Sequence, residues 1–133
     1  KRPEEQLQKD IVQYWKSISN GLPFTAVLQS NRNENSQGGV KGLRMGAIYN
    51  AMSRQAGFTD LSLFYNGKVI FLELKAKSRC VTKTGKETKS LGLSEEQVKM
   101  HKKLKSMEFE VYVIWELQQF INIVKSLTCP SCN

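Results

Sequence analysis

The dipeptide Asn66-Gly67 separates two segments whose composition is typical of β-strands, residues 60–65 and 68–75. Asn and Gly tolerate positive φ angles better than other residues, so the pair suits a two-residue type I′ turn of a β-hairpin. Such a turn fixes the register of the strands that it joins. The sequence therefore predicts one hairpin of known register, and with it which side chains face each other.

In that register Asp60 lies directly opposite Glu73, with Cβ atoms about 4.5–5.5 Å apart on one face of the sheet. Side chains alternate along a strand, so Lys75 projects on the same face as Glu73. Two convergent carboxylates suit Mg²⁺ or Mn²⁺, which use one or two protein carboxylates together with waters and substrate phosphate oxygens. A neighbouring lysine can orient a water or stabilise charge that develops on phosphorus. The hairpin thus predicts metal-assisted phosphodiester hydrolysis.

A simpler interpretation is a structural one. Asp60 would be a turn residue, and Glu73 would pair with Lys75 or Lys77 on an edge strand, contributing about 0–1 kcal/mol. The apolar run at residues 69–72 argues against it, because this run predicts a strand buried on both faces, where an unpaired charge is costly. The site hypothesis is therefore preferred.

The rest of the chain predicts alternating helices and strands in a single domain over residues 1–133. Pro3 begins an amphipathic helix, and Ser94-Glu95-Glu96-Gln97 forms a capping box that begins another. The predicted segments are a helix over 3–18, a strand over 24–29, a helix over 43–56, the hairpin, a helix from 94 to about 107, a strand over 109–115, and a helix from 117, with 126–133 as a tail. The fold class is α/β, in the order αβ(α)ββαβα.

Charge indicates an anionic partner. The chain carries 20 Lys and Arg against 12 Asp and Glu, a formal charge of +8, which fits nucleic acid, an anionic membrane or a phosphorylated substrate. A membrane is disfavoured because no apolar run approaches the roughly 20 residues of a bilayer span. Most of the excess lies between Lys75 and Lys105. We expect contacts to a nucleic-acid backbone, selective for structure more than for sequence, from Lys77, Arg79, Lys83, Lys86, Lys89, Lys99, Lys102, Lys103 and Arg44.

Alternative roles for the polar segments stay open. The alternative for the basic segment 76–93 is an ordinary solvated loop. The polar, glycine-rich segment that contains Asn31, Arg32, Asn33 and Asn35 can form a second contact surface or a mobile lid.

The three cysteines, an odd and sparse set, cannot form a disulfide framework, which favours a reducing intracellular compartment. Lys1-Arg2-Pro3 is followed by no apolar signal segment. Cys129 and Cys132 form a CxxC pair that is half of a zinc site at most. We expect a frayed tail there, although a partner chain or a missing domain could complete the site.

A family resemblance rests on four motifs in order. Gly57-Phe58-Thr59-Asp60, Glu73-Leu74-Lys75 and Leu93-Ser94-Glu95-Glu96-Gln97 resemble successive motifs of the PD-(D/E)XK nucleases. They are most similar to the virus-type replication-repair nuclease (VRR-NUC) branch, in particular to stand-alone members of phage type, which implies the cytoplasm of a bacterial or phage-infected cell. The helix that begins near Glu4 resembles the first helix of that branch, and the likeness extends from about residue 4 to 115. It implies a restriction-endonuclease-like core, in which helices flank a central mixed β-sheet.

The resemblance also implies a role for each matched residue. Asp60 and Glu73 would bind Mg²⁺ or Mn²⁺ together with the backbone carbonyl of Leu74. Lys75 would position the attacking water. Two further residues would complete the site, Glu4 by supporting the metal and Gln97 by lining the cleft.

Local structure alone can account for some of these positions. Glu4 can be a first-turn carboxylate that the helix dipole favours, and Gln97 already has a role in the capping box. His101 can contact phosphate or water, but a lone histidine is more often packed or solvated. Thr59 stands where the family usually has proline, which predicts an altered approach of the backbone rather than an inactive site.

The function expected from the sequence is that of a Mg²⁺-dependent DNA endonuclease in replication, repair or recombination. Members of this size resemble dimeric enzymes that resolve four-way (Holliday) junctions. Flap or nicking activity, a non-catalytic DNA-binding module with the same fold, and the detached nuclease domain of a larger repair protein are the alternatives.

Overall fold

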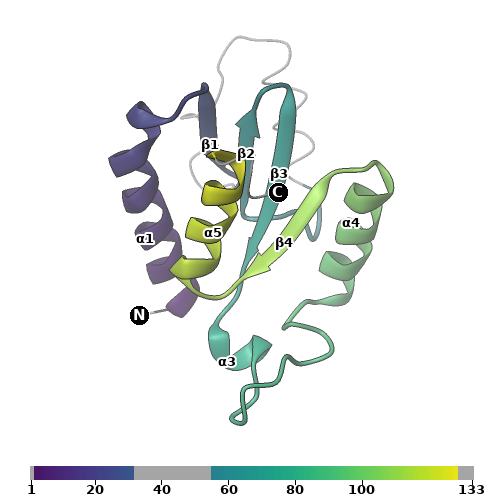
Figure 1. The fold of residues 1–133 in the computed structure, drawn as a ribbon. Coiled ribbons are helices and arrows are strands. Elements are labelled where there is room, and N and C mark those ends of the chain that lie inside the picture. The colour runs from purple at the N-terminus through teal and green to yellow at the C-terminus, as the bar shows by residue number, and fades with distance from the viewer. Residues whose placement is uncertain (1, 32–54, 129–133) are drawn as a thin grey trace.

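The computed structural model describes residues 2–31 and 55–128 (Figure 1). Helices and strands alternate along much of this part of the chain. In order they are α1 (Pro3–Ile18), the 3₁₀ turn η1 (Ser19–Gly21), β1 (Ala26–Ser30), β2 (Leu61–Tyr65), β3 (Lys68–Leu74), α3 (Lys77–Cys80), α4 (Glu95–Ser106), β4 (Glu110–Ile114) and α5 (Leu117–Thr128). The helix predicted over 43–56, Arg44, and the Cys129 and Cys132 pair fall in segments outside the described residues, apart from residues 55 and 56, which are not helical.

The four strands form one mixed sheet in the order β1-β2-β3-β4. β1 and β2 pair antiparallel, as do β2 and β3, whereas β3 and β4 are parallel. β3 lies between β2 and β4, and its residues from Ile70 to Leu74 are all buried because side chains from helices pack on both faces of the strand. The predictions of an α/β fold with a mixed sheet, and of a strand with two buried faces, are confirmed.

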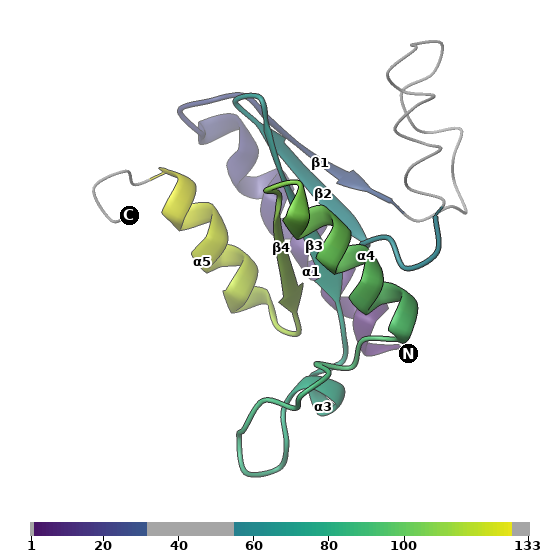
Figure 2. The same ribbon diagram turned by 90° about the vertical axis from the view of Figure 1, so that its right-hand side faces the viewer.

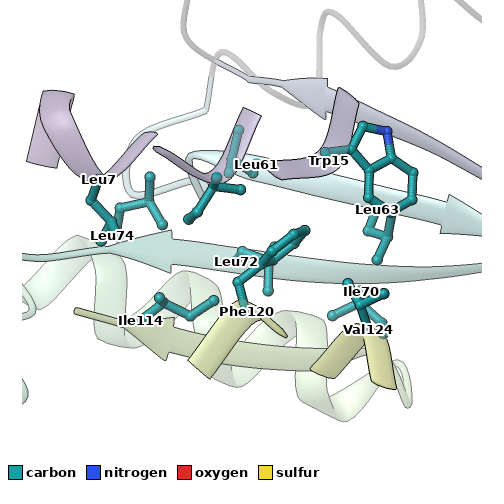
Figure 3. Packing of buried hydrophobic residues seen from close by; sticks show 11 residues of the cluster. Leu7, Trp15, Leu61, Leu63, Ile70, Leu72, Leu74, Ile114, Phe120 and Val124 are labelled. Carbon is teal, nitrogen blue, oxygen red and sulfur yellow. The ribbon is translucent and has the colours of Figure 1, made fainter. Parts of the chain in front are cut away.

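Helices cover both faces of the sheet (Figure 2). α1 and α5 pack on one face, where a core of aliphatic and aromatic side chains closes around Trp15 and Phe120 (Figure 3). α4 packs on the other face, where Phe71 contacts a smaller cluster that includes Met100 and Leu104. Since alternate residues of β3 face opposite layers, Phe71, Glu73 and Lys75 belong to the α4 side.

Both local signals of the sequence are present in the structure. Asn66 and Gly67 have φ angles of 46° and 73°, and the register pairs Tyr65 with Lys68 as the two-residue turn requires. At the start of α4, the Gln97 N–H donates to Ser94 Oγ (3.2 Å) and the Ser94 N–H donates to Gln97 Oε1 (2.9 Å). The hairpin and the capping box are therefore confirmed.

Two segments differ from the sequence prediction. The predicted basic loop begins with the short helix α3. Cys80, the last residue of this helix, is fully buried and anchors the chain against the body of the protein. At the other end of the molecule, α5 extends to Thr128, into the segment predicted as a tail. Its apolar face, with Phe120 and Val124 buried, continues the core on the α1 side of the sheet.

Gly57 allows the chain before Asp60 to pass close to α4. Its φ angle is +81°, and a Cβ atom there would lie 2.3 Å from the Glu96 carbonyl oxygen. We expect Gly57→Ala to lower the free energy of unfolding by at least about 2 kcal/mol, because both strain and a backbone clash oppose it. Urea unfolding measures this loss.

Gly67 provides the matched control for Gly57→Ala. Its φ angle is +73°, yet a Cβ atom there would meet nothing within 4 Å. Gly67→Ala should therefore lower the free energy of unfolding only by the strain of a positive φ angle, about 1 kcal/mol. Equal losses in the two variants would contradict the proposed importance of the contact between Gly57 and α4.

Candidate active site

The N-terminal ends of α1 and α4 lie at the end of the sheet where β3 finishes (Figures 1 and 2). A cleft of about 170 Å³ opens at this place. Six of the residues around it are charged. Its lining consists of Arg2, Glu4, Glu5, Asp60, Glu73, Leu74, Lys75 and Gln97. Every residue predicted to act in the metal site therefore lines one cleft, although the residues come from four separate segments of the chain.

Glu73 is a buried carboxylate with partners on α4. Its side chain is 2% exposed. Gln97 Nε2 donates to Glu73 Oε2 over 3.1 Å, and His101 Nε2 lies 3.1 Å from Glu73 Oε1. Burying a charge without such partners would be strongly unfavourable. The two α4 residues, one helical turn apart, thus make a charged Glu73 tolerable inside the protein and fix the direction of its carboxylate.

Asp60 reaches the cleft by a different geometry from the predicted one. The regular ladder between β2 and β3 ends at the Leu61–Leu72 pair. The Asp60 N–H donates to the carbonyl of Leu72 over 3.0 Å, so Asp60 does not continue the ladder directly opposite Glu73. Its Oδ2 instead accepts the N–H of Leu74 over 2.8 Å. Because the N–H and C=O of a strand residue point to the same side, the Leu74 carbonyl also faces Asp60, as a metal ligand would.

Asn31 holds the backbone around Asp60 and is not a surface residue. It is buried, and its N–H donates to the Asp60 carbonyl over 2.8 Å. Its Nδ2 donates to Ser62 Oγ (2.8 Å) and to the Thr59 carbonyl (3.1 Å). The predicted role of Asn31 in a contact surface or lid is therefore wrong. Arg32, Asn33 and Asn35 of the same predicted surface lie outside the described residues.

Lys75 and Glu4 complete the cleft from opposite sides. Lys75 is buried, with 8% of its surface exposed, and its N–H donates to the Ile114 carbonyl over 3.0 Å. Glu4 lies in the first turn of α1 and is 25% exposed. Its Oε2 is 4.0 Å from Nη1 of Arg79. Arg79 therefore links the basic segment to the cleft, a contact that no pattern in the sequence predicts.

The residues predicted to contact DNA are exposed wherever the structure describes them. Lys83, Lys86 and Lys89 lie between α3 and α4, and Lys99, Lys102 and Lys103 lie on α4. Lys77 and Arg79, the other two, contact residues of the chain. Lys77 Nζ is 3.2 Å from Glu116 Oε1, and Arg79 Nη2 donates to the Gly92 carbonyl over 2.9 Å.

His101 is uncharged at neutral pH. Burial lowers its pKa to about 4, and the nearby charges of Lys105 and Lys75 act in the same direction, while Asp60 opposes them. Its Nε2 shares a hydrogen bond with Glu73 Oε1, and the neutral ring would donate this bond to an ionised Glu73. The sequence favoured a packed or solvated histidine here, whereas the structure places it against the central carboxylate of the site. The available signal was its spacing of four residues from Gln97, which puts both on one helix face.

The protonation of His101 predicts a pH effect on stability. An unfolded histidine has a pKa near 6.5, so the folded protein binds fewer protons between about pH 4 and 6.5, and stability falls as pH drops through this range. We expect a loss of about 2 kcal/mol at pH 5 relative to neutral pH. Urea unfolding at both pH values measures the loss in the wild type and in His101→Asn. The difference between the two proteins is the part of the loss that His101 causes. Nitrogen-15 spectra should show that the neutral ring persists below pH 6, and a ring that titrates near 6.5 would contradict this.

The donor set fits a divalent cation with few protein ligands. Within the described residues, no three Asp, Glu, His or Cys side chains gather into a ready-made metal-binding group. Mg²⁺ does not require one, because it usually retains several waters and takes substrate phosphate oxygens. A carboxylate has about four lone-pair directions, so Asp60 and Glu73 can accept hydrogen bonds and still coordinate a metal. Together with the Leu74 carbonyl they supply only oxygen ligands, as Mg²⁺ and Mn²⁺ prefer.

Comparison with known proteins adds no assignment, since the chain matches no family model and no curated protein. Within residues 2–31 and 55–128, no helix has the length and apolar character needed to cross a membrane.

Proposed function

We propose that this chain is a metal-dependent DNA endonuclease of the PD-(D/E)XK type, of the VRR-NUC branch. The observation that carries the proposal is the joint presence of Asp60, Glu73 and Lys75 in one small cleft, where Glu73 and Lys75 are buried. Buried charges are costly, and a cluster of them in a cleft is typical of a functional site. A structural ion pair on an edge strand, the simpler alternative, does not fit a central strand.

Each side chain has a distinct task in this proposal. Asp60, Glu73 and the Leu74 carbonyl would hold Mg²⁺ or Mn²⁺, with Glu4 in support. When bound, such an ion polarises the scissile phosphate and lowers the pKa of water. Lys75 would orient the attacking water and offset the charge that builds on the phosphate oxygens. Gln97 and His101 would keep the Glu73 carboxylate in place.

The substrate class follows from charge. The segment from Lys75 to Lys105 has ten Lys and Arg against three Asp and Glu. It contributes Lys75 and Gln97 to the cleft, and its other basic residues form an exposed, positively charged surface. Such a surface binds phosphates irrespective of base sequence, which favours selection by DNA shape, as in four-way junctions, flaps or other branched DNA. A homodimer would present two clefts to a symmetric junction. Sedimentation of the protein with and without a four-way junction would test the dimer.

The test is cleavage of labelled four-way, flap, single-stranded and linear duplex DNA with Mg²⁺, Mn²⁺ or EDTA. We expect cleavage of branched DNA with either metal, none in EDTA, and recovery when excess Mg²⁺ is added back. Activity that survives EDTA, or no cleavage of any of these DNAs, would refute the proposal. The product lengths would separate junction resolution from flap or nicking activity.

One observation favours a second candidate, a DNA-binding module that kept the nuclease fold without its chemistry. The Glu73 carboxylate is engaged by Gln97 and His101, and Asp60 accepts the Leu74 N–H, so both acids have structural partners without a metal. Tight binding of branched DNA that neither metal converts to cleavage would establish this alternative.

A further inference from the structure

The segment between α3 and α4 contains a small ordered hairpin, residues 81–90, which we call the basic hairpin. Val81 and Glu87 form an antiparallel bridge, and the Thr82 N–H donates to the Lys86 carbonyl over 2.7 Å. Gly85 makes the turn with a φ angle of +89°, and its N–H donates to the Thr82 carbonyl over 2.9 Å. The segment is therefore built by its own hydrogen bonds and is more than the solvated loop that the sequence allowed.

The base of the basic hairpin is fixed to the body of the protein. The Thr88 N–H donates to the Cys80 carbonyl (2.8 Å) and Thr88 Oγ1 donates to the Arg79 carbonyl (2.9 Å). Cys80 is fully buried, and Arg79 faces Glu4 in the cleft. The base of the basic hairpin is thus bonded to the backbone of the buried Cys80 and of Arg79, whose guanidinium group lies 4.0 Å from Glu4 of the cleft.

The basic hairpin has no apolar packing of its own to explain it. Residues 82–87 are all exposed, and the segment extends past the end of the sheet near α3, at the end where the cleft lies (Figures 1 and 2). Lys83, Lys86 and Lys89 carry three positive charges here, opposed only by Glu87. No ion pair among the described residues involves these lysines. Like charges held close together repel, and a polyanion relieves that repulsion.

We infer that the basic hairpin binds the phosphate backbone of a DNA duplex arm that leads away from the cleft. This inference rests on the proposed nuclease function, because the cleft fixes where the cut strand lies. A duplex carries about one negative charge per 1.7 Å of its axis, so the arm offers phosphates to all three lysines at once. The basic hairpin would make the enzyme depend on the length of that arm without reading its sequence.

The experiment compares DNA binding in EDTA by three full-length proteins. They are the wild type, the triple variant Lys83→Gln/Lys86→Gln/Lys89→Gln, and the charge-matched control Lys9→Gln/Lys16→Gln/Lys125→Gln, whose exposed lysines lie on α1 and α5. Fluorescence anisotropy gives the affinity for a branched DNA at several salt concentrations between about 50 and 200 mM, because log affinity falls linearly with log salt when phosphates are contacted. Each duplex arm is then shortened in turn.

We expect the slope of log affinity against log salt to be less steep in the triple variant, by about 2 to 3, since each lysine contact contributes about 0.9 to its magnitude. Affinity at low salt should fall on the order of 100-fold, and the control should change much less. Shortening one arm should weaken the wild type to the level of the triple variant and leave that variant unchanged. A wild-type slope in the triple variant, or an equal change in the control, would overturn the inference.

The outcomes separate this inference from the proposed function. If the wild type cleaves branched DNA and the triple variant binds DNA as the wild type does, the proposed function stands and the inference about the basic hairpin is refuted. A protein that cleaves nothing, yet shows the smaller salt slope in the triple variant, refutes the nuclease proposal and supports the basic hairpin as a DNA contact.

Discussion

Asp60→Asn is expected to reduce DNA cleavage at saturating substrate by about 10²- to 10³-fold, the range seen when one electrostatic contact to a transition state is lost. The amide oxygen of asparagine can still accept the Leu74 N–H, as Asp60 Oδ2 does over 2.8 Å. The substitution therefore removes the charge and leaves the local hydrogen bond in place. Single-turnover cleavage over a range of Mg²⁺ concentrations measures the effect.

The matched control for Asp60→Asn is Asp10→Asn on α1. Asp10 accepts only a surface hydrogen bond from Gln6 among the contacts described for it (2.9 Å), so this variant should cleave like the wild type. Thermal unfolding should be similar in both variants. Full activity in Asp60→Asn would refute the metal site, whereas a loss of activity that follows a loss of folded protein would show a structural role.

Lys75→Gln is the second large effect we expect, again about 10²- to 10³-fold in kcat, with KM little changed. Lys75 is buried in the cleft that Asp60 and Glu73 line, where its charge can act in the transition state with little screening by water. Because Lys75 is buried, the substitution also changes the packing and charge of the cleft and is expected to lower the free energy of unfolding. Activity should therefore be measured well below the melting temperature of the variant.

Two further variants make the Lys75 prediction decisive. Lys75→Arg keeps the charge but replaces a compact ammonium with a planar guanidinium, so it should restore stability more than activity. Lys68→Gln removes an exposed lysine at the opposite end of β3 and should leave kcat unchanged. If Lys75→Gln retained the wild-type kcat, Lys75 would have no role in the chemistry.

The two best sequence predictions depend on residues that are close together in the chain. Asn66-Gly67 determines the turn by its own backbone preferences, and Ser94 and Gln97 satisfy each other's N–H groups across one helical turn. Neither requires knowledge of the rest of the fold. The proximity of Glu73 and Lys75 on one face follows in the same way from strand alternation.

The details of the site depend on contacts between distant residues. The hairpin register correctly brought Asp60 near Glu73, but it could not show that the ladder ends one pair earlier. At that end the Asp60 N–H donates to the Leu72 carbonyl, and the Asp60 carbonyl accepts the N–H of Asn31, which lies 29 positions earlier in the sequence. Nothing near Asn31 in the sequence distinguishes it from the polar residues that follow it.

The sequence by itself determined the hairpin, the capping box, the buried central strand and the basic segment, because each follows from local backbone preference, hydrophobic pattern or charge. Only the tertiary structure decided that α4 supplies His101 to Glu73, that Arg79 approaches Glu4, and that residues 81–90 form an ordered hairpin beside the cleft. The physical reason is that burial and long-range hydrogen bonds are properties of the packed chain. A buried histidine and a solvated one have the same neighbours in the sequence, and only packing distinguishes them.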